Sequence, residues 1–342
     1  MSYFITTPIY YVNDVPHIGH AYTTIACDIL SRFSKLNGDE TYFLTGTDEH
    51  GQKVEKAALS NKKDTQDFVD EMSKNFRDLV PYLGCQIDDF IRTTEKRHKT
   101  SAQFLWNKLK NNDQIYLSNY EGWYSIRDEA FYLESELKKT DKGFLAPSGA
   151  PVDWVKEESY FFKLSKWEDK LIQYYEKNPD SILPKSRYNE VVSFIKGGLK
   201  DLSISRTTFN WGIKVPDAEK HVMYVWIDAL CNYITALNYP NIENESFHKF
   251  WPGIHVVGKD ILRFHAVYWP AILMAADIEP PKKIFAHGWW THEGQKISKS
   301  VGNIINPYEI IDTYGLDQIR FFLFREVPFG NDGDFSKGAI AQ

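Results

Sequence analysis

Cysteine is scarce in this chain of 342 residues: the thiols are Cys27, Cys85 and Cys231, and no two form a Cys-x-x-Cys pair. A disulfide framework and a cysteine-rich zinc site are therefore excluded. No run of about 18 apolar residues occurs. The first residues, MSYFITTPIYY, contain neither a basic stretch followed by an apolar run nor an arginine-rich presequence. These absences predict an unprocessed, soluble, cytoplasmic protein.

An excess of positive charge is also missing, since 40 Lys and Arg stand against 46 Asp and Glu, for a formal net charge of −6. No global field attracts nucleic acid, although a local basic patch can still bind it. The hydrophobic share of 43% and the charged share of 25% are ordinary for a globular protein. The length predicts two or three domains.

What the sequence does contain is an alternation of strand and helix patterns. Residues 3–12, YFITTPIYYV, are typical of a buried strand, and Ile18, Tyr22 and Ile25 then recur at helical spacing. The stretch GDETYFLTGTDEHG repeats the pattern, with a helix expected from Gln52. This order predicts an α/β fold, a parallel sheet with helices on both faces.

The character of the chain changes in its middle, where short aromatic strands and charged turns replace this alternation. We predict four parts: a first half of the α/β domain (1–114), an inserted connective module (115–220), a second half (221–292) and a C-terminal segment (293–342). Strand-to-helix units are expected again in HVMYVWIDALCNYITAL and in the residues that follow.

The stretch VNDVPHIGH (12–20) begins the first helix. Pro16 suits the first helical position, with Asn13 or Asp14 as cap, so the helix should start near His17. Its N–H groups face the ligand side of the sheet, Gly19 permits close approach, and His17 and His20 project from one side, which suits a polyphosphate. Taken alone, the two histidines are also compatible with a metal site or with ordinary packing.

A second signal is KISKS at 296–300, where Lys296 and Lys299 flank Ser298 after a strand. Mobile lysines there can reach phosphates. The pair of motifs, His-Ile-Gly-His after the first strand and Lys-Ile-Ser-Lys-Ser after the last, resembles class I aminoacyl-tRNA synthetases.

The resemblance extends along nearly the whole chain and is to the methionyl-tRNA synthetase family. It is carried by TTPIYYVNDVPHIGHAYT, FLTGTDEHGQKV, ISRTTFNWGI, YVWIDAL, VVGKDILRFH and KISKSVGN, in the family's order. Ile297 replaces the methionine of the usual KMSKS, and because it is also apolar we expect the loop to pack similarly. The resemblance implies a Rossmann-type fold split by the connective module and followed by the start of a stem-contact region. The family's C-terminal anticodon-binding domain is not represented.

The resemblance implies methionine activation with ATP and Mg²⁺, followed by transfer to tRNA(Met). Residues assigned to catalysis are His17, His20, Lys296, Lys299, Asp48 and Arg206. Residues assigned to ATP are His17, Gly19, His20, Gly258, Lys259, Asp260, Lys296, Ile297, Ser298 and Lys299. In this assignment Asp48 holds the α-ammonium group beside Arg206, and Asp260 accepts from the ribose hydroxyls. From the residues alone, Asp48 could be a turn former and Lys259 a surface charge.

A methionine pocket is expected from two helical stripes, Trp226 with Ala229 or Leu230 and Tyr233, and Ile261 with His265 and Trp269. Aromatic walls with few polar tips suit a flexible, polarizable thioether. The same stripes are compatible with plain core. The resemblance favours the pocket and adds Ile9 and Tyr11 beside the first strand.

The connective module has Ser125 and Asp128 where many family members carry a Cys-x-x-Cys zinc knuckle. We therefore predict no structural zinc, and the module is also too short for the large editing domain of related enzymes. A monomer is expected for this chain. The rival hypotheses are another adenylyl- or nucleotidyltransferase of the same superfamily, and a catalytically idle RNA-binding or scaffolding fragment.

Overall fold

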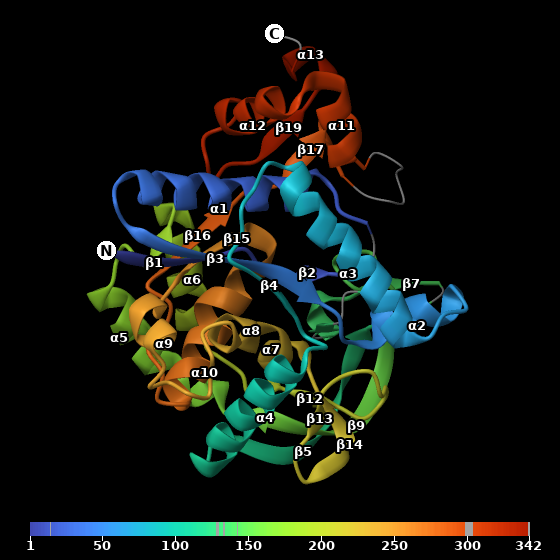
Figure 1. The fold of residues 1–342 in the computed structure, drawn as a ribbon. Coiled ribbons are helices and arrows are strands. Elements are labelled where there is room, and N and C mark those ends of the chain that lie inside the picture. The colour runs from blue at the N-terminus through green and yellow to red at the C-terminus, as the bar shows by residue number, and fades with distance from the viewer. Residues whose placement is uncertain (14, 128–129, 133, 142, 298–303, 341–342) are drawn as a thin grey trace.

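A computed structural model describes residues 1–342 except 14, 128–129, 133, 142, 298–303 and 341–342. Its centre is a seven-stranded sheet formed by described residues (Figure 1). The strands are β1 (Ser2–Thr6), β2 (Tyr10–Tyr11), β3 (Glu40–Asp48), β4 (Asp89–Arg92), β10 (Ile182–Leu183), β15 (Ile254–Gly258) and β16 (Lys283–His287). Their order is β10-β16-β15-β1-β3-β2, with β4 also paired to β3, and each of these pairings is parallel. The predicted parallel sheet is confirmed.

Helices cover both faces of this sheet, as the sequence predicts (Figure 1). Successive strand residues point to opposite faces. Phe4 belongs to the large core cluster beneath α4 (Lys96–Asn111) and α10 (Trp269–Ala275), whereas Ile5 packs with Cys27 of α1 (Ile18–Leu36). Strands apolar on both sides are what a doubly covered parallel sheet requires.

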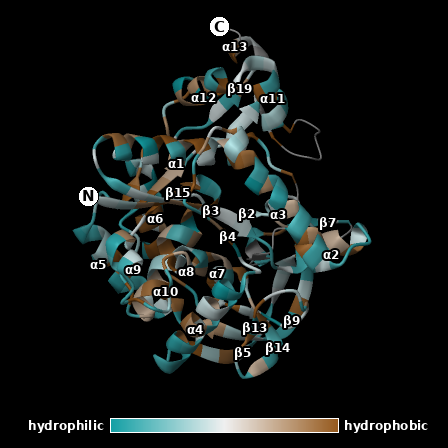
Figure 2. Ribbon diagram, in the orientation of Figure 1, coloured by the Kyte–Doolittle hydropathy of each residue, from teal (hydrophilic) through white to brown (hydrophobic). Residues whose placement is uncertain are grey.

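The remaining helices flank this core. They are α2 (Gln52–Ser60), α3 (Thr65–Tyr82), α5 (Glu168–Lys177), α6 (Lys185–Lys196), α7 (Val225–Asp228), α8 (Asn232–Thr235) and α9 (Glu245–Phe250). Helix α2 begins at Gln52 as predicted, and the Asp64 carboxylate caps α3 by accepting from the N–H groups of Gln66 and Asp67. Figure 2 shows hydrophilic colour on the surface helices α3 and α5. Of the helices described, none is long and apolar enough to cross a membrane.

Antiparallel strands dominate the connective part. The two long strands β5 (Ile115–Ser125) and β9 (Asp153–Phe162) pair with each other. On the outer sides of this pair, β6 (Ala130–Tyr132) pairs with β5 and β11 (Leu202–Ser203) pairs with β9. A second small sheet contains β12 (Ser205–Arg206), β13 (Lys214–Val215) and β14 (Ala218–Met223), and β7 (Lys138–Thr140) pairs with β8 (Gly143–Leu145). Short helical turns lie at η1 (Glu134–Glu136) and η2 (Leu164–Trp167).

Two features of this region differ from the prediction made from the sequence. Strand β14 was expected to enter the parallel sheet, but it pairs antiparallel with β12 and β13. Conversely, β10 lies within 115–220 yet pairs parallel with β16, and Leu171 of α5 and Val191 of α6 belong to the main core cluster. A two-residue strand carries too short a pattern to be recognised. The bounds of the four parts stay a prediction.

The described residues from Trp290 onward, which include the predicted C-terminal segment, form a unit of their own on the outer side of α1 (Figure 1). It contains β17 (Trp290–His292), β18 (Gln295–Lys296), α11 (Pro307–Tyr314), α12 (Leu316–Arg325), β19 (Gly333–Phe335) and α13 (Lys337–Ile340). Ile319 and Phe322 of α12 pack in one cluster with Ile18 and Tyr22 of α1. Beside this apolar contact, the buried Asp28 carboxylate accepts from Arg32 at 2.8 Å and from Arg320 at 2.7 Å.

Replacing Asp28 with Asn should destabilise the fold. Arg320, which is largely buried, would lose its counter-charge, and breaking such a pair costs about 3–5 kcal/mol when fully buried. Because Arg32 is half exposed, we expect a loss of about 2–4 kcal/mol in the free energy of unfolding, measured by urea denaturation. The control is Asp78→Asn, which breaks the exposed pair with Lys74 and should cost about 1 kcal/mol or less. Equal losses in the two variants would contradict the interpretation.

Candidate active site

A cavity of about 1080 Å³ opens where several parallel strands end. Pro8 and Ile9 follow β1, Asp48 is the last residue of β3, and Lys259 follows β15, so the cavity lies at the carboxyl edge of the sheet, the usual ligand side of such folds. Twelve of the residues singled out from the sequence line it: Ile9, Tyr11, Asp48, Arg206, Trp226, Ala229, Leu230, Tyr233, Lys259, Asp260, Ile261 and His265. Residues far apart in the sequence therefore line one cavity.

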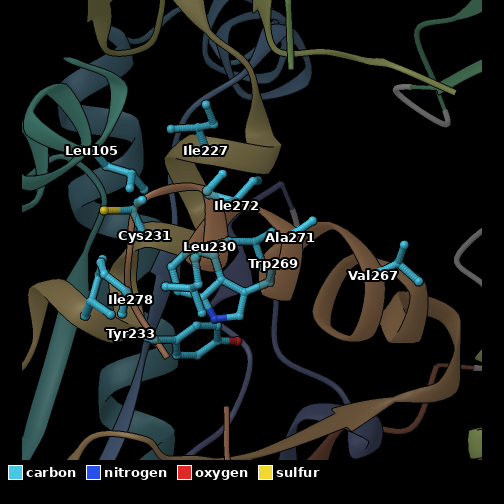
Figure 3. Packing of buried hydrophobic residues seen from close by; sticks show 14 of the residues in the cluster. Leu105, Ile227, Leu230, Cys231, Tyr233, Val267, Trp269, Ala271, Ile272 and Ile278 are labelled. Carbon is cyan, nitrogen blue, oxygen red and sulfur yellow. The ribbon is translucent and has the colours of Figure 1, made fainter. Parts of the chain in front are cut away.

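Trp269 is the predicted pocket residue that the cavity lining does not include. Its side chain is fully buried, with its ring centre 6.2 Å from that of Tyr233, and Figure 3 shows it packed beside Tyr233 and Leu230. The predicted stripe assumes a regular α-helix. The chain instead forms a 3₁₀ turn, η4 (Lys259–Ile261), and a π turn, η5 (Phe264–Tyr268), before α10. Ile261, His265 and Trp269 therefore do not lie on the single regular α-helix that the predicted stripe requires.

Aromatic rings that the sequence reading missed complete the wall. Phe264 lies 4.1 Å from Trp226 between ring centres, Tyr268 lies 5.5 Å from it, and Tyr224 lies 5.7 Å from it. All of them line the cavity. Tyr224 lies two residues before Trp226, and Phe264 and Tyr268 follow Ile261 at helical spacing, so the same periodicity could have found Phe264 and Tyr268.

The polar tip of the wall is the pair Tyr233 and His265. Nδ1 of His265 lies 3.0 Å from the carbonyl oxygen of Ile261, which can only accept, so Nδ1 carries the proton. Burial lowers the pKa of His265 to about 4, so the ring is neutral and its Nε2 accepts. The Tyr233 hydroxyl therefore donates to Nε2, at 2.7 Å.

Asp48 and Arg206 place opposite charges on the same cavity. Asp48 is 7% exposed and Arg206 2% exposed. The Arg206 guanidinium lies over the Tyr224 ring at 3.7 Å, donates to Ser203 Oγ at 2.7 Å and has the Glu157 carboxylate 3.5 Å away. A stacked, hydrogen-bonded guanidinium of this kind is held in one orientation. The cavity thus offers an anchored cation and a carboxylate to an amino-acid-like ligand.

The first helix begins differently from the prediction. His17 is the N-cap residue of α1, so Pro16 lies outside the helix and not at its first position. The reason is a capping box made by the two histidines: Nδ1 of His17 accepts from the Gly19 N–H at 3.1 Å, and Nδ1 of His20 accepts from the His17 N–H at 3.0 Å. A side chain at Gly19 would collide with the His17 ring, since its Cβ would lie 2.9 Å from Cε1.

This capping also fixes which nitrogen of His20 carries the proton. Burial, together with the neighbouring His17, lowers the pKa of His20 well below its ordinary value, so the ring is neutral. Because Nδ1 accepts, Nε2 carries the hydrogen and is a donor. His17, Gly19 and His20 are not part of the cavity lining. They supply donors at the N-terminus of α1, where anions are favoured.

The stretch 258–260 joins the cavity to the C-terminal segment. Lys259 Nζ lies 2.7 Å from both carboxylate oxygens of Asp332, and Asp260 Oδ1 accepts from Trp289 Nε1 at 3.2 Å. At Gly258 an added Cβ would lie 2.5 Å from Asp260 Oδ1, so glycine is required for that side chain's position.

The lysine motif is described only in part. Ile297 packs against the cluster formed by α1, α11 and α12. The expected packing of the loop as a whole stays a prediction. The backbone of Lys296 belongs to β18. The Lys296 side chain, Ser298 and Lys299 lie outside the described part of the structure. Among the residues that the structure does describe, no group of three or more His, Cys, Asp or Glu could hold a metal ion.

Comparison with known proteins decides the family. The family described as "tRNA synthetases class I (M)" matches residues 3–141 and 146–342. The chain belongs to this family. It is 64% identical over 340 residues to the methionine–tRNA ligase of Rickettsia conorii and 54% identical to that of Mesorhizobium japonicum, in each case over 99% of this chain and 66% of the relative. The chain therefore spans 66% of the length of these curated relatives.

Solved structures give the same result. The Mycobacterium tuberculosis methionyl-tRNA synthetase in complex with methionyl-adenylate superimposes with a TM-score of 0.97 at 50% identity, over 99% of this chain and 67% of that one. The apo form of that enzyme gives a TM-score of 0.82 at 47% identity, over 99% and 64% of the two chains. The fold expected from the resemblance, a class I synthetase core, is confirmed.

The neutral histidines of this site predict acid sensitivity of the fold. His265 takes up a proton at pH 6.5 when unfolded and only near pH 4 when folded, so stability is full above about pH 6.5 and falls as the pH drops towards 4. At pH 5.0, His265 alone accounts for a loss of about 2 kcal/mol relative to pH 7.5. The free energy of unfolding can be measured by urea denaturation at pH 7.5 and at pH 5.0. Between these two pH values it should fall by about 2 kcal/mol less in His265→Gln than in the wild type. A variant that declines as steeply as the wild type would contradict the assignment.

Proposed function

We propose that the protein is a methionine–tRNA ligase. It activates L-methionine with ATP to methionyl-AMP and pyrophosphate, and then transfers the methionyl group to the 3′-terminal adenosine of tRNA(Met). The observation that carries the proposal is the cavity at the carboxyl edge of the sheet, where an aromatic wall of Trp226 and Tyr233 adjoins the charges of Asp48 and Arg206. The relatives named above support it, since the Mycobacterium tuberculosis enzyme was solved in complex with methionyl-adenylate.

The wall is suited to the methionine side chain. Methionine is unbranched and polarizable, and it gains from contacts between its sulfur and aromatic rings. Trp226, Tyr233 and His265, together with Ile9 and Ile261, would surround it. In this proposal Asp48 accepts from the α-ammonium group, and Arg206 lines the same cavity.

The nucleotide would bind beside this wall, as the Mg²⁺ complex of ATP. Asp260 would accept from the ribose hydroxyls, and Gly258 leaves room for the Asp260 side chain. His17, Gly19 and His20 at the N-terminus of α1 would donate to the phosphates, and Lys296 and Lys299 would stabilise the charge that develops on them. We infer a cytoplasmic, monomeric protein without structural zinc, in line with the sequence.

In the first step, a methionine carboxylate oxygen attacks the α-phosphorus of ATP. A phosphorus–oxygen bond forms to the carboxylate, and the bond to the bridging oxygen of pyrophosphate breaks. The protein supplies positioning and charge stabilisation and no side-chain nucleophile. In the second step, the terminal 2′-hydroxyl of the tRNA attacks the carbonyl carbon of the adenylate, its proton is released, and AMP leaves.

The first test is ATP–pyrophosphate exchange with each of the standard amino acids in turn. Methionine should support exchange at least about 100-fold better than leucine or isoleucine in kcat/KM, because the wall discriminates by shape as well as by apolar area. Exchange that does not depend on an amino acid would point to another nucleotidyltransferase. Absence of exchange with every amino acid would support the idle-fragment hypothesis instead.

A second prediction separates the two halves of the site. His20→Asn keeps an oxygen that can accept from the His17 N–H, but it removes the Nε2–H donor proposed to bind the phosphates. The kcat of exchange should therefore fall about 10²–10³-fold, while the methionine KM stays within about threefold. Trp226→Ala removes a wall, so the methionine KM should rise about tenfold or more. Steady-state exchange kinetics measure both. The same change of KM in the two variants would contradict the division of roles.

A further inference from the structure

A buried carboxylate next to the cavity wall binds two histidines at once. Nδ1 of His50 lies 2.7 Å from Asp228 Oδ2, and Nε2 of His98 lies 3.0 Å from Asp228 Oδ1. The three side chains are 6%, 0% and 3% exposed for His50, His98 and Asp228. Such a group must satisfy its charge inside the protein, and here both oxygens do so through ring N–H donors.

The three residues come from segments that meet at the cavity. His50 follows Asp48 by two positions in the turn between β3 and α2, and Asp228 ends α7, directly between Trp226–Ile227 and Ala229–Leu230. His98 belongs to α4, which packs beneath them in the main core. The carboxylate therefore links the segment that carries the Asp48 charge to the segment that carries the apolar wall.

The segment with the wall has little regular structure to hold it. It changes from α7 to a 3₁₀ turn, η3 (Ala229–Cys231), and then to α8, so each piece is three or four residues long. Helices this short have few internal hydrogen bonds and depend on side-chain contacts. Asn232 Nδ2 donates to the Ala229 carbonyl at 2.7 Å, but it is Asp228 that links this segment to the turn directly after Asp48.

The turn that follows Asp48 is also held by Trp211. Its Nε1 donates to the Glu49 carbonyl, at 2.6 Å, and the Gly51 N–H donates to the Trp211 carbonyl at 3.2 Å. The His50 ring lies 5.7 Å from the Trp211 ring. Trp211 thus fixes the turn to the connective part, and the Asp228–His50 hydrogen bond fixes it to the wall.

The charge state of the carboxylate agrees with this geometry. Burial alone would raise the pKa of Asp228, but His50 and His98 outweigh burial and lower it below its ordinary value. Asp228 is therefore ionised, and it accepts from a ring N–H on each side. An asparagine in its place would keep the shape but set an N–H group against one ring N–H, so one of the two hydrogen bonds would be lost.

We propose that Asp228, through His50, is a positioning residue for methionine: it sets the distance between the Asp48 carboxylate and the wall formed by Trp226, Ala229 and Leu230. The inference rests on the proposed function, because it assigns the α-ammonium group of methionine to Asp48 and the methionine side chain to the wall. Asp228 does not line the cavity and takes no part in the chemistry. A looser link would be felt by methionine, which spans both segments, and not by ATP.

The experiment measures exchange kinetics of the full-length protein with Asp228→Asn, His50→Gln and the double variant. Each single change should raise the methionine KM about tenfold, and the ATP KM should stay within about twofold. Because both changes break one link, the double variant should be no worse than the poorer single variant. If Asp228→Asn does not fold, His50→Gln alone carries the test, through the same split between the two KM values.

The matched control is Asp277→Asn, the same substitution at an exposed carboxylate that pairs with Lys108 outside the cavity. It should leave both KM values unchanged. A parallel rise of both KM values, a fall in kcat alone, or additive effects in the double variant would overturn the proposal. Wild-type protein without methionine-dependent exchange would instead refute the proposed function, so the two failures can be told apart.

Discussion

The parallel pairing of β1 with β15 is the contact on which the rest of the structure depends. It places Ile5 opposite Ile254, so the first strand of the chain pairs with a strand that follows the whole connective part in the sequence. Parallel strands run in the same direction, so their carboxyl ends meet at one edge. With β3 on the other side of β1, the carboxyl ends of three strands converge there, and Ile9, Asp48 and Asp260 lie at or just after these ends. Without this pairing the residues of the candidate site would have no common location.

Buried charges hold the surrounding segments onto that sheet. Asp28 links α1 to α12 through Arg320, Glu49 accepts two hydrogen bonds from Arg92, and Asp228 links two histidines. Replacing such a pair by apolar residues is often tolerated, whereas removing one partner is costly. The buried carboxylates Asp28, Glu49 and Asp228 therefore contribute by fixing which segments meet. Each of them binds a partner that lies far away in the sequence.

Much of this architecture could be predicted from the residues. The alternation in YFITTPIYYV and GDETYFLTGTDEHG is strong because those strands are apolar on both faces, and twelve assigned residues do line one cavity. The failures have local causes. His17 caps the first helix, a role expected for Asn13 or Asp14, and Pro16 lies outside the helix, because imidazole nitrogens can accept like the usual capping oxygens. Trp269 is not in the wall because irregular turns, which no sequence period signals, separate it from Ile261, whereas Phe264 follows Ile261 at helical spacing and could have been found.

The tip of the pocket shows how such a wall can accept a thioether. Tyr233 and His265 are polar, and a polar group that loses water without gaining a partner costs free energy. Here the Tyr233 hydroxyl donates to His265 Nε2 and the ring donates to the Ile261 carbonyl, so each proton already has an acceptor within the protein. A sulfur that accepts hydrogen bonds only weakly can then contact the rings without leaving a donor unsatisfied. A ligand with its own strong donor or acceptor at that depth would have to compete with these bonds. The neutral state of His265, which follows from its burial, is what makes the pair self-sufficient.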